Sequence, residues 1–144
     1  FVFDHVLIQT RLIDGTFPDT SRLIPDSFDY SMSIDSTSLL NSIDRASLLT
    51  NEQTNIVKLT MNQDTVILSS FSQEIGSVEE NLSRAFYKGE PLKISFSARY
   101  LTDAIKSING QKVRVLFTGE MKPFIIKDFE REDIIQLVLP VRTY

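Results

Sequence analysis

Residues 28–49 read FDYSMSIDSTSLLNSIDRASLL, and their pattern changes from that of a strand to that of a helix. In the first part apolar side chains alternate with polar ones, the period of a strand with one buried face. The second part begins at a capping residue, Asp35 or Ser36, and then carries apolar residues at spacings of three and four, typical of a helix that packs on one side. The strand positions are Phe28, Tyr30, Met32 and Ile34, and the helix positions are Leu39, Leu40, Ile43, Ala46 and Ser47.

The same order recurs in the second half of the chain. Leu92, Ile94 and Phe96 alternate with polar residues, Ser97 is placed to cap a second helix, and Asn109-Gly110 supplies a left-handed stop. Further strands are predicted after the first helix at 56–61, 65–71 and 78–87, and after the second at 113–117, 123–127 and 134–138. The pattern therefore predicts an α+β domain: duplicated β-α-β-β-β halves with two helices on one face of antiparallel sheet.

The segments at the two ends of the chain differ from this plan. Residues 1–12 are predicted as one strand that stops at the turn Asp14-Gly15. No hairpin partner for that strand is evident, so we interpret 15–25, with two stiffening prolines, as a connector. The chain ends on the apolar run LVLPVRTY, although termini are usually polar and frayed. Connector and tail together could line a hydrophobic groove, edged by Arg22 and Arg142, that suits an extended peptide.

Composition indicates a globular protein. The 42% hydrophobic and 24% charged contents are ordinary, and no apolar run approaches the roughly 20 residues of a membrane span. The absence of cysteine excludes disulfides and thiolate sites and is compatible with the cytoplasm. The net charge of −4 does not predict a direct reader of duplex DNA. Since residue 1 is Phe, without signs of a signal peptide, we expect a chain cut from a longer protein.

No catalytic set is evident. The single histidine, His5, has no second metal-ligating partner, and the five glycines stand singly and form no phosphate loop. Carboxylates cluster at 79–80 and at 130–133, but neither cluster has a base or a phosphate binder beside it. We therefore expect no enzyme, no cofactor and no metal. A hydrolase that uses the acidic turn near Glu132 is the weaker alternative.

Four stretches resemble the bacterial β sliding clamp, the beta subunit of DNA polymerase III. They are LIDGTFPDTSRLIP (12–25), IDRASLLTNEQTNIVKL (43–59), SFSARYLTDAIKSI (95–108) and LVLPVRTY (137–144). The last is similar to the Gram-positive form. The resemblance implies a head-to-tail homodimer that encircles duplex DNA as a ring and tethers the polymerase, with three similar domains per subunit. Residues 1–14 would then be the last strand of the middle domain, 15–25 the interdomain connector and 26–144 the third domain.

The resemblance also implies a peptide-binding groove for short motifs of the polymerase, the clamp loader and repair proteins. The residues at groove positions are Pro18, Arg22, Leu23, Ser97, Tyr100, Met121, Pro123, Leu137, Leu139, Pro140, Val141 and Arg142. Ser97, Pro123 and Val141 depart from the enterobacterial pattern.

Two further surfaces follow from the same resemblance. Leu48 and Leu49, with Glu79 and Glu80, would meet the first domain of another subunit, so the chain alone is expected to be a monomer. The sparse cations that would face DNA are Arg45, Arg99 and Lys106. The alternative from another class is a stand-alone peptide-binding scaffold that does not encircle DNA.

Overall fold

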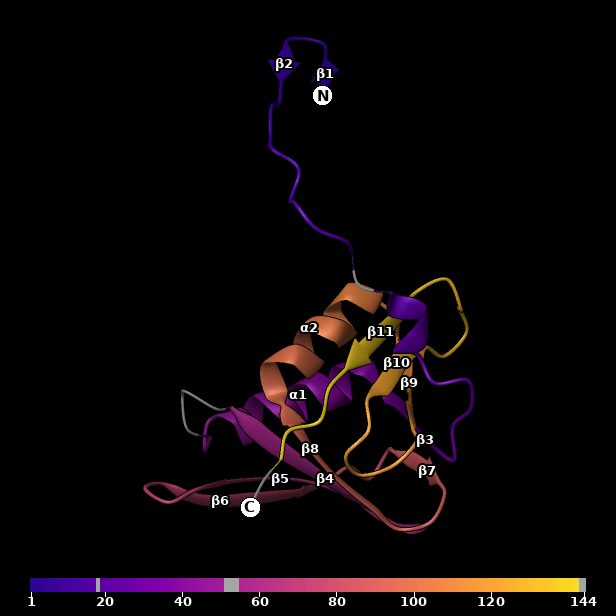
Figure 1. Ribbon diagram of the computed structural model, residues 1–144. Coiled ribbons are helices and arrows are strands. Elements are labelled where there is room, and N and C mark those ends of the chain that lie inside the picture. The colour runs from indigo at the N-terminus through magenta and orange to yellow at the C-terminus, as the bar shows by residue number, and fades with distance from the viewer. Residues whose placement is uncertain (18, 51–54, 143–144) are drawn as a thin grey trace.

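The computed structural model describes residues 1–17, 19–50 and 55–142, without the side chain of Ser21. Antiparallel strands form a five-stranded sheet in the order β11-β10-β9-β3-β7 and a four-stranded sheet in the order β6-β5-β4-β8 (Figure 1). The elements of the body are β3 (Tyr30–Asp35), α1 (Ser36–Ser47), β4 (Ile56–Met61), β5 (Val66–Ser72), β6 (Gly76–Asn81), β7 (Phe86–Lys88), β8 (Leu92–Ser97), α2 (Ala98–Ile108), β9 (Lys112–Phe117), β10 (Phe124–Asp128) and β11 (Ile135–Val138).

The two predicted halves are β3-α1-β4-β5-β6 and β8-α2-β9-β10-β11, with β7 between them. The first strand of each half pairs in the sheet of the other half, β3 beside β9 and β8 beside β4. Two equivalent backbone hydrogen bonds repeat this exchange. The amide of Ser36 donates to the Gln111 carbonyl at 2.9 Å, and that of Ala98 donates to the Asn55 carbonyl at 2.8 Å. The duplicated α+β plan is therefore confirmed, and the halves are interlocked.

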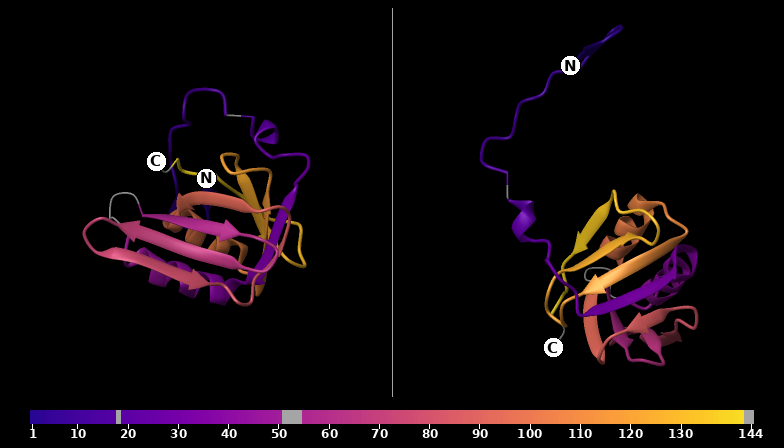
Figure 2. Two further views of the ribbon diagram at one scale, coloured as in Figure 1. Left: turned by 90° about the horizontal axis from the view of Figure 1, so that it is seen from below. Right: turned by 90° about the vertical axis from the view of Figure 1, so that its right-hand side faces the viewer.

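Both helices lie on the same side of the sheets, where α1 and α2 contact each other (Figures 1 and 2). The buried faces of the helices and of both sheets form one continuous core. At its centre the Phe124 ring contacts the rings of Phe96 and Phe117, with centroids 5.6 and 5.3 Å away. The residues after Pro25 thus bury a core of their own.

The helix ends follow local chemistry. Asp35 is the N-cap of α1, since its Oδ1 accepts the amide of Ser38 at 2.7 Å. The hydrogen bonds from Ser38 lower the pKa of the Asp35 carboxyl. Ser97 stands at the N-cap of α2, but its side chain makes no capping bond. The left-handed residue that ends α2 is Asn109, with φ 53°. Helix α2 therefore ends on Asn109 itself, and Gly110 follows it.

The prediction of a single strand over residues 1–12 was wrong. The chain forms a small hairpin of β1 (Val2–Phe3) and β2 (Val6–Leu7), turned at Asp4, whose φ is 47°. The side chains of this segment are exposed, and the chain as far as Phe17 extends away from the body (Figures 1 and 2). With no layer against its apolar side chains, the segment satisfies its backbone groups by folding back on itself.

The strand predicted at 78–87 is also corrected, because it is two strands in different sheets. β6 belongs to the four-stranded sheet and β7 to the five-stranded one. Between them Leu82 is buried in the core, and its amide donates to the Val66 carbonyl at 2.8 Å. This anchor turns the chain from one sheet to the other.

Candidate functional site

The carboxy-terminal tail is held against the free edge of β8. One side of β8 pairs with β4, and on the other side the amide of Val141 donates to the Ser95 carbonyl at 2.7 Å. The preceding strand β11 contacts α2 and ends at the buried Val138. The tail thus leaves one sheet and reaches the edge of the other, which explains why a terminus carries so many apolar residues.

Apolar side chains stay open along this tail and beside it. Leu139 is 61% exposed, and Leu137, Pro140 and Val141 are half-buried. Tyr100, in the first turn of α2 directly after β8, is 65% exposed. The remaining predicted groove positions here are Ser97 and Pro123, both half-buried, and Met121 and Arg142, both exposed.

The connector contributes a short helical turn, η1 (Thr20–Arg22). The amide of Leu23 donates to the Thr20 carbonyl at 3.1 Å, and Arg22 pairs with Asp19 at 3.3 Å. Leu23 is 50% exposed. In Figures 1 and 2, η1 lies on the side of the five-stranded sheet that carries β10 and β11. Pro18 lies outside the described residues, and a continuous groove from connector to tail stays a prediction.

The predicted subunit surface includes an open apolar patch. Leu48, just past the end of α1, is 77% exposed, and Leu49 is half-buried. The end of α1 and the β5–β6 hairpin project on the same side (Figures 1 and 2). That hairpin exposes Phe71 and Ile75, which the sequence analysis did not single out. The available signal was Ile75 itself, an apolar residue inside a polar turn.

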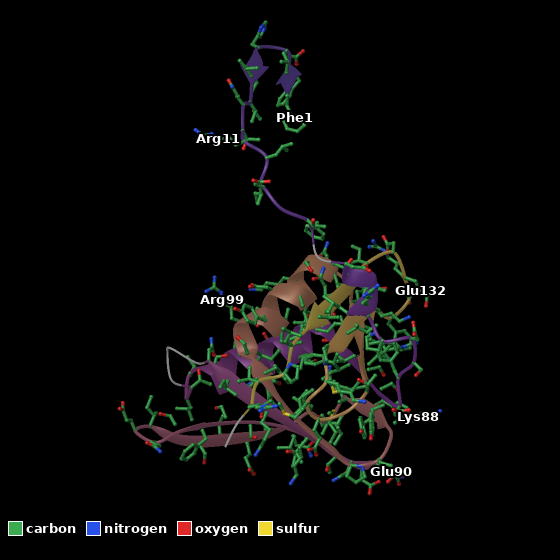
Figure 3. The ribbon with its side chains drawn as sticks, viewed as in Figure 1. Phe1, Arg11, Lys88, Glu90, Arg99 and Glu132 are labelled. Atoms are coloured by element: carbon green, nitrogen blue, oxygen red, sulfur yellow. The ribbon has the colours of Figure 1, made fainter. Side chains whose placement is uncertain are left out.

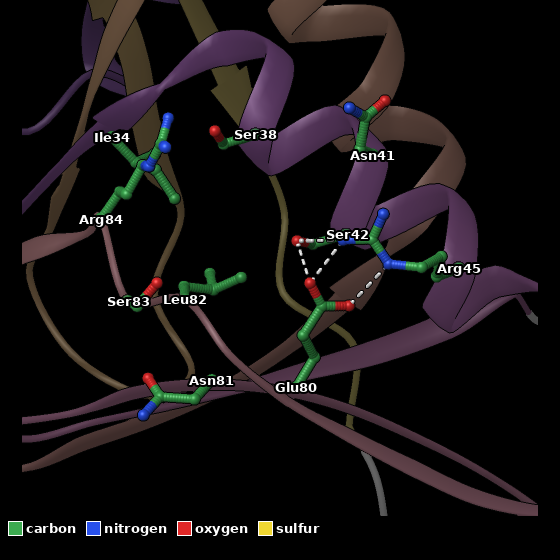
Figure 4. A pocket seen from close by; sticks show the side chains of 10 residues that line it. All are labelled: Ile34, Ser38, Asn41, Ser42, Arg45, Glu80, Asn81, Leu82, Ser83 and Arg84. Carbon is green, nitrogen blue, oxygen red and sulfur yellow. Dashed lines mark hydrogen bonds and ion pairs between the residues drawn. The ribbon is translucent and has the colours of Figure 1, made fainter.

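Arg45 and Glu80 form a bidentate ion pair between α1 and the edge strand β6 (Figure 4). The Nε–Oε2 distance is 3.0 Å and the Nη2–Oε1 distance is 2.5 Å; Ser42 Oγ donates to the same Oε1 at 2.6 Å. The hydrogen bonds from Arg45, then that from Ser42, lower the pKa of the Glu80 carboxyl, while partial burial opposes them. A predicted DNA-facing cation thus already neutralises a predicted interface acid.

The other interface and DNA-facing candidates are less constrained. Glu79 is exposed on β6. Arg99 lies 4.0 Å from Asp103 one turn along α2, and Lys106 is exposed in the last turn. Figure 3 shows the Arg99 side chain directed away from the body.

The acidic turn near Glu132 is built from structural contacts. Lys127 Nζ donates to Glu132 at 2.9 Å, Arg131 pairs with Asp133, and the Asp128 carboxylate accepts the amides of Glu130 and Arg131. Within 1–17, 19–50 and 55–142, no group of three or more His, Cys, Asp or Glu could hold a metal ion. In the same ranges, no helix has the length and apolar character to cross a membrane.

The chain is similar to known proteins over most of its length. The family model of the DNA polymerase III beta subunit, C-terminal domain, matches residues 21–142. The beta sliding clamp of Staphylococcus aureus is 44% identical over the whole chain, which spans only 38% of that relative's length. The sliding clamp of Bacillus subtilis is 46% identical, with a TM-score of 0.85 over 93% of this chain and 36% of that one. A sliding clamp of Pseudomonas aeruginosa bound to griselimycin is 25% identical, with a TM-score of 0.85 over 90% of this chain and 35% of that one.

The range matched by the family model spans both halves, both helices and the tail as far as Arg142. The chain belongs to the DNA polymerase III beta subunit family, the bacterial sliding clamps, and corresponds to their C-terminal domain.

Proposed function

We propose that this chain serves in a sliding clamp, a ring that encircles duplex DNA and tethers the replicative polymerase without catalysing a reaction. The observation that carries the proposal is the tail, held by Val141 at the edge of β8 with Leu139 left open to solvent. A terminus fixed in this way can present apolar side chains to a partner without unfolding. The relative bound to griselimycin supports a ligand site in this family.

The groove would bind an extended motif through apolar contact and a few polar groups. Its apolar positions are Pro18, Leu23, Tyr100, Met121, Pro123, Leu137, Leu139, Pro140 and Val141, with Ser97 beside them. Arg22 and Arg142 would donate hydrogen bonds to peptide carbonyls and fix the register. The middle domain would supply the remaining wall, so this chain alone should bind such a motif weakly.

The ring would close through the surface around Leu48 and Leu49. An exposed apolar patch of this kind marks an interface. Phe71 and Ile75 extend it along the β5–β6 hairpin, and Glu79 would add a charged contact. Glu80 is held by Arg45, so its part would be to fix the edge strand β6.

The acidic net charge suits a ring that slides. Each phosphate bound tightly would add salt-dependent affinity and hinder movement. Arg99 and Lys106 on α2 would supply sparse inner cations, whereas Arg45 is largely neutralised by Glu80.

The test separates peptide binding from ring closure in the intact clamp. Removing residues 139–144 should abolish binding of a polymerase motif peptide and processive synthesis, while the ring stays dimeric. The physical cause is lost apolar contact, worth roughly 25 cal/mol per Å² no longer covered. Leu48→Lys with Leu49→Lys should do the reverse, because burying unpaired charge opposes closure: peptide binding persists, and retention on circular DNA is lost.

A truncated clamp that still supports processive synthesis would rule out the groove assignment. Retention that does not depend on whether the DNA is circular or linear would instead favour the stand-alone scaffold.

A further inference from the structure

A second surface of the domain has the build of a binding trough, and it is separate from the tail. It lies on the outer face of the five-stranded sheet, over β7, β3 and β9, and encloses about 820 Å³. Its lining residues come mainly from those strands, with Phe28 and Phe129 at its borders. Figure 3 labels Lys88 at the β7 end of the molecule.

Strand register explains why this face is hollow. Ser33 of β3 pairs with Phe86 of β7 on one side and with Arg114 of β9 on the other. Ser31, two residues earlier, pairs in the same way with Lys88 and Leu116. The small serines therefore form a floor between two walls of long side chains. Since neighbouring strands lie about 4.8 Å apart, the walls stand about 10 Å apart, room for one extended chain.

The walls are cationic although the chain is acidic overall. Lys88, Lys112 and Arg114 line the trough, and Asp29 is the one acid among its lining residues. Among the described residues none of the three cations has a carboxylate partner within 4 Å. Asp35, opposite Lys112 in the sheet, caps α1 instead. Glu132 is near enough to Arg114 to sense its charge, but it hydrogen-bonds Lys127.

Phe129 holds two of these cations in place. Its amide donates to the Lys112 carbonyl at 2.9 Å. Lys112 Nζ lies 4.1 Å from its ring centroid and Arg114 Cζ lies 4.6 Å from it. Cations stacked on an aromatic ring lose less conformational freedom on binding an anion than free side chains would. Phe86 on the β7 wall is 70% exposed, and Leu116 lies on the β9 wall, so each wall carries an apolar side chain as well as a cation.

These features favour a peptide over a nucleic acid. Single-stranded nucleic acid needs open aromatic faces for base stacking. Here the Phe129 ring already carries two cations, and the rings of Phe28 and Tyr30 are half-buried, so Phe86 is the one widely open ring among the lining residues. A short chain that alternates carboxylates with apolar side chains matches both walls.

We propose that the trough over Ser31 and Ser33 is a second docking site for an extended acidic peptide segment of a partner protein. Carboxylates of the segment pair with Lys88, Lys112 and Arg114, and apolar side chains between them lie against Phe86 and Leu116. This site is independent of the groove at the tail.

Fluorescence anisotropy with a labelled synthetic peptide of alternating glutamate and leucine tests the site in the 144-residue chain. We expect saturable binding that weakens as salt is raised. Lys112→Glu with Arg114→Glu should weaken it roughly tenfold or more, since two attractive contacts become repulsive. Phe86→Ser, at a position 70% exposed, should also weaken it. The matched control is Lys58→Glu with Lys93→Glu, the same charge change on exposed positions of the other sheet.

Three outcomes would overturn the proposal. One is the absence of saturable binding of the peptide. Another is an equal loss in the control, which would indicate nonspecific charge attraction. The third is tighter binding of labelled oligothymidylate than of the peptide. Removal of residues 139–144 should leave the peptide affinity unchanged, so failure of the groove and failure of the trough are distinguishable.

Discussion

The two interlocked halves have the same arrangement of strands and helix, but different side chains fill their shared core. Superposing their strand registers places Ile34, Met61 and Val66 of the first half where the second half has Phe96, Phe117 and Phe124. The Met61–Val66 pair of neighbouring strands thus corresponds to the Phe117–Phe124 pair. All six residues are buried. The pattern of apolar positions determines the strand and helix arrangement that the two halves share. The side-chain volume at each buried position can differ between the halves when neighbouring side chains compensate.

The edges of the halves differ as well. At α2 positions equivalent to Ser42 and Arg45 stand Ala104 and Ser107, so the second half has no counterpart of the ion pair with Glu80. Its last strand, β11, ends in the buried Val138, and the tail continues to β8. In the first half an ion pair holds the edge strand β6, and apolar side chains near it are exposed to solvent. In the second half apolar contacts hold the edge strand β11, and the chain continues from it as the tail.

The largest expected effect on the free energy of unfolding comes from truncating core side chains, which are larger in the second half than in the first. Phe124→Ala should lower the free energy of unfolding by about 3–5 kcal/mol, the usual cost of removing a buried phenylalanine ring. Val66→Ala, at the matched position, removes two methyl groups and should cost about 2 kcal/mol. Urea denaturation followed by circular dichroism measures both. Equal losses would mean that the cost of truncation does not follow the side-chain volume buried at these matched positions.

The ion pair at the edge of the first half should have a smaller, pH-dependent effect. Because the folded pKa of Glu80 is lowered from its ordinary value of 4.5, its stabilisation is fully present above that pH and is lost as the pH falls through the folded value. Glu80→Gln should therefore cost at most about 1 kcal/mol at neutral pH, as partly exposed pairs do. Urea denaturation at neutral and acid pH should show the difference from wild type vanish in acid.

Glu79→Gln is the matched control, because it removes one charge from the neighbouring, exposed position on the opposite face of β6. A cost for Glu80→Gln that is the same at both pH values, or that Glu79→Gln reproduces, would show that the pair does not stabilise the edge strand.

Sequence periodicity predicted the body of the domain well. Both helices, the buried apolar positions of the strands and strand β4 at 56–61 follow directly from alternation and capping, because one face of each element must be buried. The fused strand at 78–87 failed for a nonlocal reason. Leu82, just past β6, is buried in the core and hydrogen-bonded to Val66, and no local pattern encodes the turn that follows it.

The sites were only partly predictable. Apolar residues in the tail signalled a surface near the terminus, but the hydrogen bond from Val141 to Ser95 joins residues far apart in sequence. Arg45 and Glu80 were assigned to different surfaces because a sequence does not show that α1 and β6 meet. The trough was missed because its lining comes from three strands that are far apart in the sequence. The role of Phe129 becomes visible only when Lys112 and Arg114 are seen stacked on its ring.

The smallest expected effect concerns the open side of the first half. At the positions equivalent to Leu48 and Leu49 the second half has Gly110 and Gln111, so the fold of a half does not require an apolar pair there. Leu48→Lys should therefore change the free energy of unfolding of this chain by no more than about 0.5 kcal/mol, as surface substitutions usually do. Sedimentation should show a monomer for both wild type and variant. A large loss of stability would mean that Leu48 is held by contacts within the chain, and a tight wild-type dimer that the substitution dissolves would mean that the patch binds a second copy of this same domain.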